Sequence, residues 1–295
     1  MGTPEFAAMI LCDLIALGLE VALVVTQEDK PVGRKQILTA PSVKEAAIRH
    51  NLPIAQPHKL ETIADEIAAL KPDLIVVAAY GQILSKRVLA IAPCLNLHAS
   101  LLPKYRGASP VQAALLNGDK TAGITIMYME EGLDTGQMAG FCALPTADHT
   151  AQTLTNALAK EGAKLLYETL KRLENICPIA QHGADADYVR KIAKQHGLID
   201  FERSAEAIER AYRAYTPQPT IYLASGLRLL ELAAIEGETQ AITAGAITAI
   251  DGNGVVVACK KGAVKISLVQ PSGKNPMGAK DYLNGKRLGV GDYLS

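Results

Sequence analysis

Short apolar runs alternate with helix-like segments over residues 1–176. The run at 73–79, Asp-Leu-Ile-Val-Val-Ala-Ala, is typical of a strand buried on both faces of a parallel sheet. Strands that alternate with helices predict an α/β domain with a mostly parallel sheet. The predicted strands lie at 21–25, 73–79, 94–98, 124–129 and 140–144, and the predicted helices at 4–18, 42–50, 60–70, 85–91, 110–116 and 152–173.

The pattern changes after residue 176. Residues 177–200 are polar and irregular, which predicts a linker, and 205–215 has the pattern of a helix. Short β-prone runs then follow, and Asp251-Gly-Asn-Gly254 predicts a hairpin turn. Short strands so closely spaced predict a small β-barrel in a second domain, residues 201–295, after a first domain of residues 1–176. The predicted strands of this domain are 229–235, 246–250, 255–259 and 264–269.

The composition is that of an ordinary globular protein. Of 295 residues, 49% are hydrophobic and 20% charged, and 30 basic residues balance 30 acidic ones, which argues against a polybasic protein. Five scattered cysteines without a CxxC motif favour a reducing compartment. The most apolar stretch, 7–25, is interrupted by Asp13 and Glu20, so no membrane span is expected. We therefore expect a cytoplasmic protein that does not enter the membrane.

Candidate chemistry is concentrated in residues 95–107 and 130–136. Asn96 and His98 are two apart on a predicted strand, so they share one face at its carboxyl end, where open parallel sheets place ligand sites. A carboxamide beside an imidazole can bind a developing oxyanion and move a proton, and Asp134 could fix the imidazole. The alternative is structural: polar residues at a strand end, and an Asx turn at Asp134. No dinucleotide, P-loop or serine-hydrolase motif occurs.

Four motifs in order carry a resemblance to a known family. Asn96-x-His98, Ser-Leu-Leu-Pro at 100–103, Tyr105-Arg-Gly107 and Asp134-Thr-Gly136 together resemble the signature of the folate-dependent formyltransferases. The resemblance implies a Rossmann-like catalytic domain, 10-formyltetrahydrofolate as co-substrate and no metal. It further implies that Asn96, His98 and Asp134 form the catalytic trio, and that the tetrahydrofolate site includes Ser100, Leu101, Leu102 and Pro103.

A basic loop points to the acceptor. Residues 26–35, Thr-Gln-Glu-Asp-Lys-Pro-Val-Gly-Arg-Lys, resemble the loop with which some family members enter the acceptor arm of initiator methionyl-tRNA. Arg34 is at the matching position, with Lys30 and Lys35 beside it. The alternative is a solvated Gly/Pro surface loop with ordinary charges.

The C-terminal region supports the same acceptor. Residues 215–219, 267–274 and 277–283 resemble the family's C-terminal barrel, which is of the oligonucleotide-binding type. From residue 255 onward there are seven basic and two acidic residues, a net charge of 7 − 2 = +5. Such a cluster can bind the phosphates of a nucleic-acid backbone. Scattered solvating lysines are the alternative. The tRNA-binding candidates here are Lys260, Lys261 and Lys274.

The expected function is formyl transfer from 10-formyltetrahydrofolate to the α-amine of initiator methionyl-tRNA, for translation initiation. Asn96 and His98 would stabilise the oxyanion, and Asp134 would orient His98 and assist deprotonation. The alternatives are a formyltransferase for glycinamide ribonucleotide or an amino-sugar nucleotide, and a non-catalytic protein that binds tRNA or folate. The family resemblance implies a monomer.

The beginning of the chain is unusual. Gly2-Thr3-Pro4 predicts a helix start, with Thr3 as N-cap and Pro4 at the first helical position. In the family, this turn follows a central strand of the sheet, and only Met1 precedes it here. The resemblance therefore predicts that the first strand is missing, together with a short lead, roughly 8–12 residues.

Overall fold

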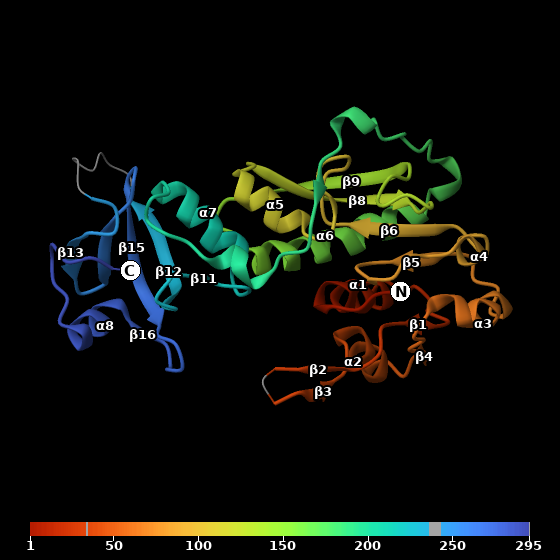
Figure 1. Cartoon of the computed structure of the whole chain (residues 1–295). Coiled ribbons are helices and arrows are strands. Elements are labelled where there is room, and N and C mark those ends of the chain that lie inside the picture. Colours follow the sequence, from red (N-terminus) through yellow and green to blue (C-terminus); the bar gives the residue numbers. More distant parts are fainter. Residues whose placement is uncertain (34, 236–242, 295) are drawn as a thin grey trace. The chain divides into compact units, whose positions relative to one another are not determined.

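The computed structural model describes residues 1–33, 35–235 and 243–294. The chain forms two compact units (Figure 1). The first contains residues 1–110, 121–145 and 154–189, and the second contains 111–120, 146–153 and 190–295. Residues 177–189 of the predicted linker thus belong to the first unit. No helix of the described ranges combines the length and apolar character needed to cross a membrane.

The first unit is built on a mixed sheet in the order β5-β6-β8-β9, which is parallel at one end and antiparallel over the rest. β5 pairs in parallel with β6, while β8 pairs antiparallel with β6 and β9 with β8 (Figure 1). A further parallel pair joins β1 to β4. The mixed α/β class with parallel pairing is as predicted. The strands are β1 Val24–Val25, β4 Ile54–Ala55, β5 Ile75–Val77, β6 Cys94–His98, β8 Thr121–Tyr128 and β9 Met138–Pro145.

Met1 and Gly2 lie between β1 and β5. The Gly2 amide donates to the Val25 carbonyl oxygen at 3.0 Å, and the Ala78 amide donates to the Met1 carbonyl oxygen at 2.9 Å. Gly2 and Ala78 form a parallel bridge. These two residues therefore occupy the central position that the family resemblance assigns to the first strand.

Helices cover both faces of this sheet. On one face, apolar side chains of η1, α3 and α4 form a buried cluster with Ile75 and Cys94. On the other face, Gly162 of α6 lies so close to the sheet that a Cβ would meet Ile124 at 2.4 Å and Leu97 at 3.4 Å. The helices of this unit are α1 Glu5–Ala16, α2 Ser42–Arg49, η1 Leu60–Ile63, α3 Ala64–Ala69, α4 Lys86–Leu89 and most of α6 Ala151–Leu170, whereas α5 Pro110–Asn117 belongs almost entirely to the second unit.

The cap of α1 differs from the prediction. Pro4 is the N-cap, in extended conformation, and the helix begins at Glu5. The Thr3 hydroxyl donates instead to the Tyr80 carbonyl oxygen at 2.8 Å. The predicted cap at Thr3 was wrong because the first helix amides, those of Ala7 and Ala8, donate to the Pro4 carbonyl oxygen, and the Thr3 hydroxyl is oriented toward a carbonyl that is distant in sequence.

The second unit contains α7 and an antiparallel sheet in the order β11-β12-β15-β14-β13, with β16 paired to β15. The Asp251–Gly254 turn joins β13 and β14, as predicted. The predicted strands are all present, with ends shifted by at most one residue, and β11, β16 and α8 were not predicted. The elements are α7 Ala205–Tyr215, β11 Ile221–Tyr222, β12 Arg228–Ile235, β13 Ile247–Asp251, β14 Gly254–Ala258, β15 Ala263–Gln270, β16 Met277–Gly278 and α8 Ala279–Lys286.

Two short pairings of the first unit were also not predicted. β2, in the basic loop, pairs antiparallel with β3, which directly follows the loop, and the two form a hairpin. β10, in the predicted linker, pairs in parallel with β7, the strand that begins directly after Tyr105. These strands are β2 Lys30–Val32, β3 Ile37–Thr39, β7 Arg106–Gly107 and β10 Tyr188–Val189, and short helical turns lie at η2 Leu173–Asn175, η3 Gly183–Asp185 and η4 Lys194–Gly197.

Candidate active site

β6 places two polar side chains on a buried face of the sheet. Side chains alternate along a strand, so Asn96 and His98 point to the same face as Cys94. Both residues are nearly enclosed, with 8% of Asn96 and 6% of His98 exposed. In the described part of the chain, the Asn96 carboxamide has no hydrogen-bond partner. It is therefore a donor that a ligand can use.

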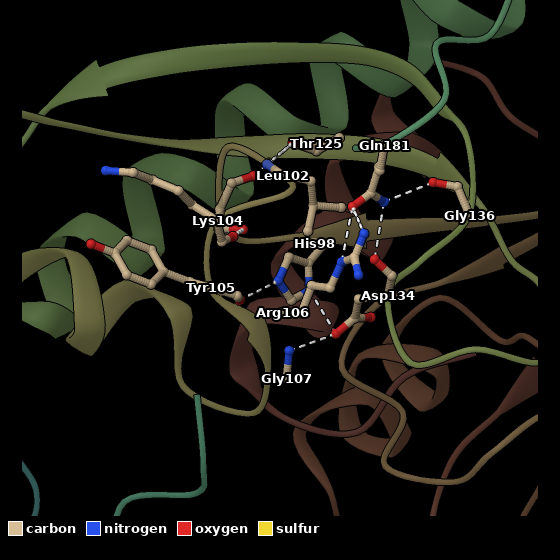
Figure 2. Close-up of polar contacts among 11 residues, drawn as sticks. His98, Leu102, Lys104, Tyr105, Arg106, Gly107, Thr125, Asp134, Gly136 and Gln181 are labelled. Carbon is tan, nitrogen blue, oxygen red and sulfur yellow. Dashed lines mark hydrogen bonds and ion pairs between the residues drawn. The ribbon is translucent and has the colours of Figure 1, made fainter. Parts of the chain in front are cut away.

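The His98 imidazole is held between a backbone carbonyl and a carboxylate (Figure 2). Its Nε2 lies 2.9 Å from the Tyr105 carbonyl oxygen, and its Nδ1 lies 3.6 Å from Oδ2 of Asp134. A carbonyl oxygen only accepts, so Nε2 carries a proton. Nδ1 is therefore the nitrogen that can take up or give a proton, and a carboxylate faces it.

Asp134 is fixed by its loop. Its Oδ2 accepts from the Gly107 amide at 2.7 Å, and its backbone has a φ of +54°, which Asp adopts more readily than most residues. Two residues later, a Cβ on Gly136 would lie 1.7 Å from the Tyr128 carbonyl oxygen, so only glycine fits. The loop thus presents the carboxylate to His98 in a single position.

The segment predicted to contact tetrahydrofolate folds as a tight turn against β8. The Ser100 hydroxyl donates to the Lys104 carbonyl oxygen at 2.6 Å. Thr125, fully buried, donates to the Ser100 carbonyl oxygen at 2.7 Å and accepts from the Leu102 amide at 3.1 Å (Figure 2). Leu101 packs over Gly123. The polar groups of Ser100 and Leu102 are therefore used within the turn, and residues 100–103 sit directly between His98 and Tyr105.

Sequence reasoning missed three residues beside the trio. Arg106 is 5% exposed, and its Nη1 donates to the Tyr188 hydroxyl at 3.0 Å. Its Nε and Nη2 both donate to Gln181 Oε1, at 3.1 and 2.8 Å. The Gln181 amide in turn donates to the carbonyl oxygens of Asp134 and Gly136 (Figure 2). Arg106 could have been found from the sequence, because it belongs to the Tyr-Arg-Gly motif. Gln181 and Tyr188 belong to no motif that would have indicated them.

The basic loop predicted to bind tRNA has a firmly held base. Asp29 pairs with Lys44 at 2.8 Å and accepts from Gln56 at 2.8 Å, and these hydrogen bonds keep the pKa of Asp29 below its ordinary value. Lys30 and Lys35 are exposed on the hairpin above it. The third candidate, Arg34, lies outside the described residues.

The candidates of the second unit do not form one cluster. Lys260 and Lys261 lie in the turn before β15, and Lys274 follows its far end; all three are exposed. Eight residues of strand separate the two groups by roughly 25 Å. They can therefore contact only separate phosphates.

The donor set suits a formyl carbonyl. Among the described residues, the Asn96 carboxamide is unpaired, and Nδ1 of His98 becomes a second donor when the ring is protonated at both nitrogens, so both can donate to an oxygen that gains negative charge. Within the described ranges, no three His, Cys, Asp or Glu side chains come together as ligands for a metal ion.

Comparison with known families identifies the class of protein. The model described as formyl transferase matches residues 1–170, and the model described as formyl transferase, C-terminal domain, matches residues 191–287. The chain belongs to the formyltransferase family.

Two curated relatives narrow the class to a particular activity, and both are named methionyl-tRNA formyltransferase. The relative from Campylobacter curvus is 50% identical over 300 residues, which cover 100% of this chain and 98% of the relative. The relative from a Nitratiruptor species is 49% identical over 297 residues, covering 99% of this chain and 97% of the relative.

Solved structures share the fold. The N-formyltransferase from Helicobacter canadensis, in complex with folinic acid and dTDP-3-aminofucose, matches with a TM-score of 0.69 at 18% identity, over 90% of this chain and 96% of that chain. A methionyl-tRNA formyltransferase from Clostridium thermocellum matches with a TM-score of 0.53 at 19% identity, over 73% and 86%. At these identities the similarity shows the fold alone.

Proposed function

We propose that this chain transfers the formyl group of 10-formyltetrahydrofolate to the α-amine of initiator methionyl-tRNA. The observation that carries the proposal is the meeting of Asn96, His98 and Asp134 at one buried position, with the carboxylate facing Nδ1. The full-length similarity to relatives named for this activity supports the choice of acceptor.

In the proposed mechanism, the formyl donor supplies a carbon already activated by its bond to a folate nitrogen. Asn96 donates to the formyl oxygen, and His98, protonated at both nitrogens, donates from Nδ1 as negative charge develops. Asp134 keeps the imidazolium oriented and assists removal of the proton from the attacking amine. The new C–N bond to the amine replaces the C–N bond to the folate nitrogen, which receives the proton.

The basic residues complete the proposal. Lys30, Arg34 and Lys35 of the basic loop would contact the acceptor arm, and Lys260, Lys261 and Lys274 would contact phosphates elsewhere on the tRNA. Residues 100–103 would contribute to the tetrahydrofolate site through their backbone and apolar side chains. A cytoplasmic location and a monomeric state complete the set of predictions.

Three acceptors distinguish the proposal from its alternatives. The purified full-length protein is incubated with 10-formyltetrahydrofolate and charged initiator tRNA, glycinamide ribonucleotide or an amino-sugar nucleotide, and the formylated product is measured. Formylation of methionyl-tRNA alone is expected. Transfer to either small acceptor instead would overturn the choice of acceptor, and tRNA binding without any transfer would identify a non-catalytic binding protein.

A further inference from the structure

We propose that Gln181 is a positioning residue for the formyl-transfer site, through which residues 179–189 hold the Asp134 loop against the loop that contacts His98. This inference rests on the proposed function for its kinetic consequence. Gln181 lies outside both regions matched by the family models, which end at 170 and resume at 191.

The amide of Gln181 is saturated by four contacts. Its Oε1 accepts from Nε and Nη2 of Arg106, and its Nε2 donates to the carbonyl oxygens of Asp134 at 3.0 Å and Gly136 at 2.7 Å. These partners dictate the orientation of the amide, because a flipped amide would oppose donors to the guanidinium and an acceptor to two carbonyls. The side chain therefore joins both loops in a single geometry.

Both loops joined by Gln181 touch the His98 ring or its partner. Arg106 stands between Tyr105, whose carbonyl binds Nε2, and Gly107, whose amide binds Asp134. On the other side, Gln181 binds the backbone of Asp134 itself. The link thus fixes the carboxylate relative to the ring without contacting either reacting group.

The segment that carries Gln181 is anchored on both sides. Ile179 and Met138 exchange two backbone hydrogen bonds, of 2.8 and 2.9 Å. Further along, Arg106 and Ala108 donate to the carbonyl oxygens of Asp187 and Val189, at 2.8 and 3.0 Å. Gln181 lies between these anchors, so its backbone position is set by the start of β9, directly after the Asp134 loop, and by the segment that contains Arg106.

Two substitutions distinguish the contact of Gln181 with Arg106 from its contacts with Asp134 and Gly136. Gln181→Met has a similar length and no polar amide, and Gln181→Glu keeps an acceptor for Arg106 but loses the donors to Asp134 and Gly136. Gln195→Ala, at an exposed glutamine, is the matched control. The kcat and KM for methionyl-tRNA are measured as a function of pH. Hydrogen exchange of the Gly107 amide, which donates to Asp134, is measured on the ligand-free protein.

Both Gln181 variants are expected to lose about 10- to 100-fold in kcat, because small displacements of catalytic groups are costly. The KM for tRNA should change less than about threefold, and the pH profile of kcat should move. The Gly107 amide should exchange faster, while the amides of the central strands stay protected. Wild-type kcat and Gly107 protection in both variants would overturn the inference. If the Gln181→Met protein is unfolded, the inference is judged on the kcat and the Gly107 exchange of Gln181→Glu alone. An inactive wild-type protein would refute the proposed function, and the exchange data would still test the link.

Discussion

Nε2 of His98 lies 2.9 Å from the carbonyl oxygen of Tyr105, and this bond decides which nitrogen does the chemistry. Because Nε2 must donate, the exchangeable position is Nδ1, on the side of Asp134. The backbone at the Tyr-Arg-Gly motif therefore fixes the tautomer of the neutral ring, and the carboxylate acts on the nitrogen opposite to it.

Asp134→Asn should reduce kcat about 100-fold or more while leaving the fold intact. The asparagine can still accept from the Gly107 amide, but it removes the negative charge that faces Nδ1. Single-turnover formylation of methionyl-tRNA measures the effect, with Asp73→Asn, at an exposed aspartate, as the control. A rate within twofold of the wild type would exclude a role for this charge.

Gly136→Ala should destabilise the protein by about 1–3 kcal/mol, because its Cβ would lie 1.7 Å from the Tyr128 carbonyl oxygen. Gly183→Ala is the matched control, since no heavy atom lies within 4 Å of the position of its Cβ. Thermal unfolding of the two variants gives the comparison. Equal melting temperatures would show that the Asp134 loop can accommodate the extra methyl group, which would contradict the single position of the loop described above.

The cysteines should differ in reactivity. Burial raises the pKa values of Cys94 and Cys259 to about 11, so only about one thiol in a thousand is ionised at pH 8. Cys177 is exposed. Iodoacetamide at pH 8 should therefore modify Cys177 first, and Cys94 and Cys259 only after unfolding, as followed by mass spectrometry of the peptides. Rapid labelling of either buried thiol in the folded protein would contradict the described packing.

Asp29→Asn should raise the KM for methionyl-tRNA several-fold and leave tetrahydrofolate binding unchanged, because it weakens the base of the hairpin that carries Lys30 and Lys35. Since the pKa of Asp29 is lowered in the folded state, its bonds to Gln56 and Lys44 persist above the unfolded value of 3.8 and are lost as the pH falls through the folded value. Steady-state kinetics at neutral pH provides the test. An unchanged KM for methionyl-tRNA would show that the hairpin does not take part in tRNA recognition.

The double substitution Lys260→Ala/Lys261→Ala should lower the slope of log affinity against log salt concentration by about one for each phosphate contact that is lost. Lys164→Ala, which removes an exposed lysine paired with Glu161, should leave the slope unchanged. Filter binding of tRNA at several salt concentrations measures both. Identical slopes for all three proteins would mean that the two lysines do not contact phosphates.

The sequence predicted those features that depend on local pattern. β6 has the predicted bounds, Cys94–His98, because a short apolar run with polar residues at alternate positions has few other ways to fold. The cap at Thr3 was wrong because the Thr3 hydroxyl is oriented toward the carbonyl of Tyr80, which is distant in sequence. Gln181 was missed because its segment lacks periodicity, and its structure comes from pairing with residues 75 positions earlier in the chain. No local signal reports such a contact.

The parallel pairing of β10 with β7 also limits how this chain can be recombined with others. A chimera that exchanges the C-terminal part at the end of α6 would discard Gln181 and leave Arg106 without its acceptor. A junction placed after Val189 would retain the complete support of the Asp134 loop. For the construction of hybrid enzymes, the minimal transferable catalytic module therefore extends to residue 189.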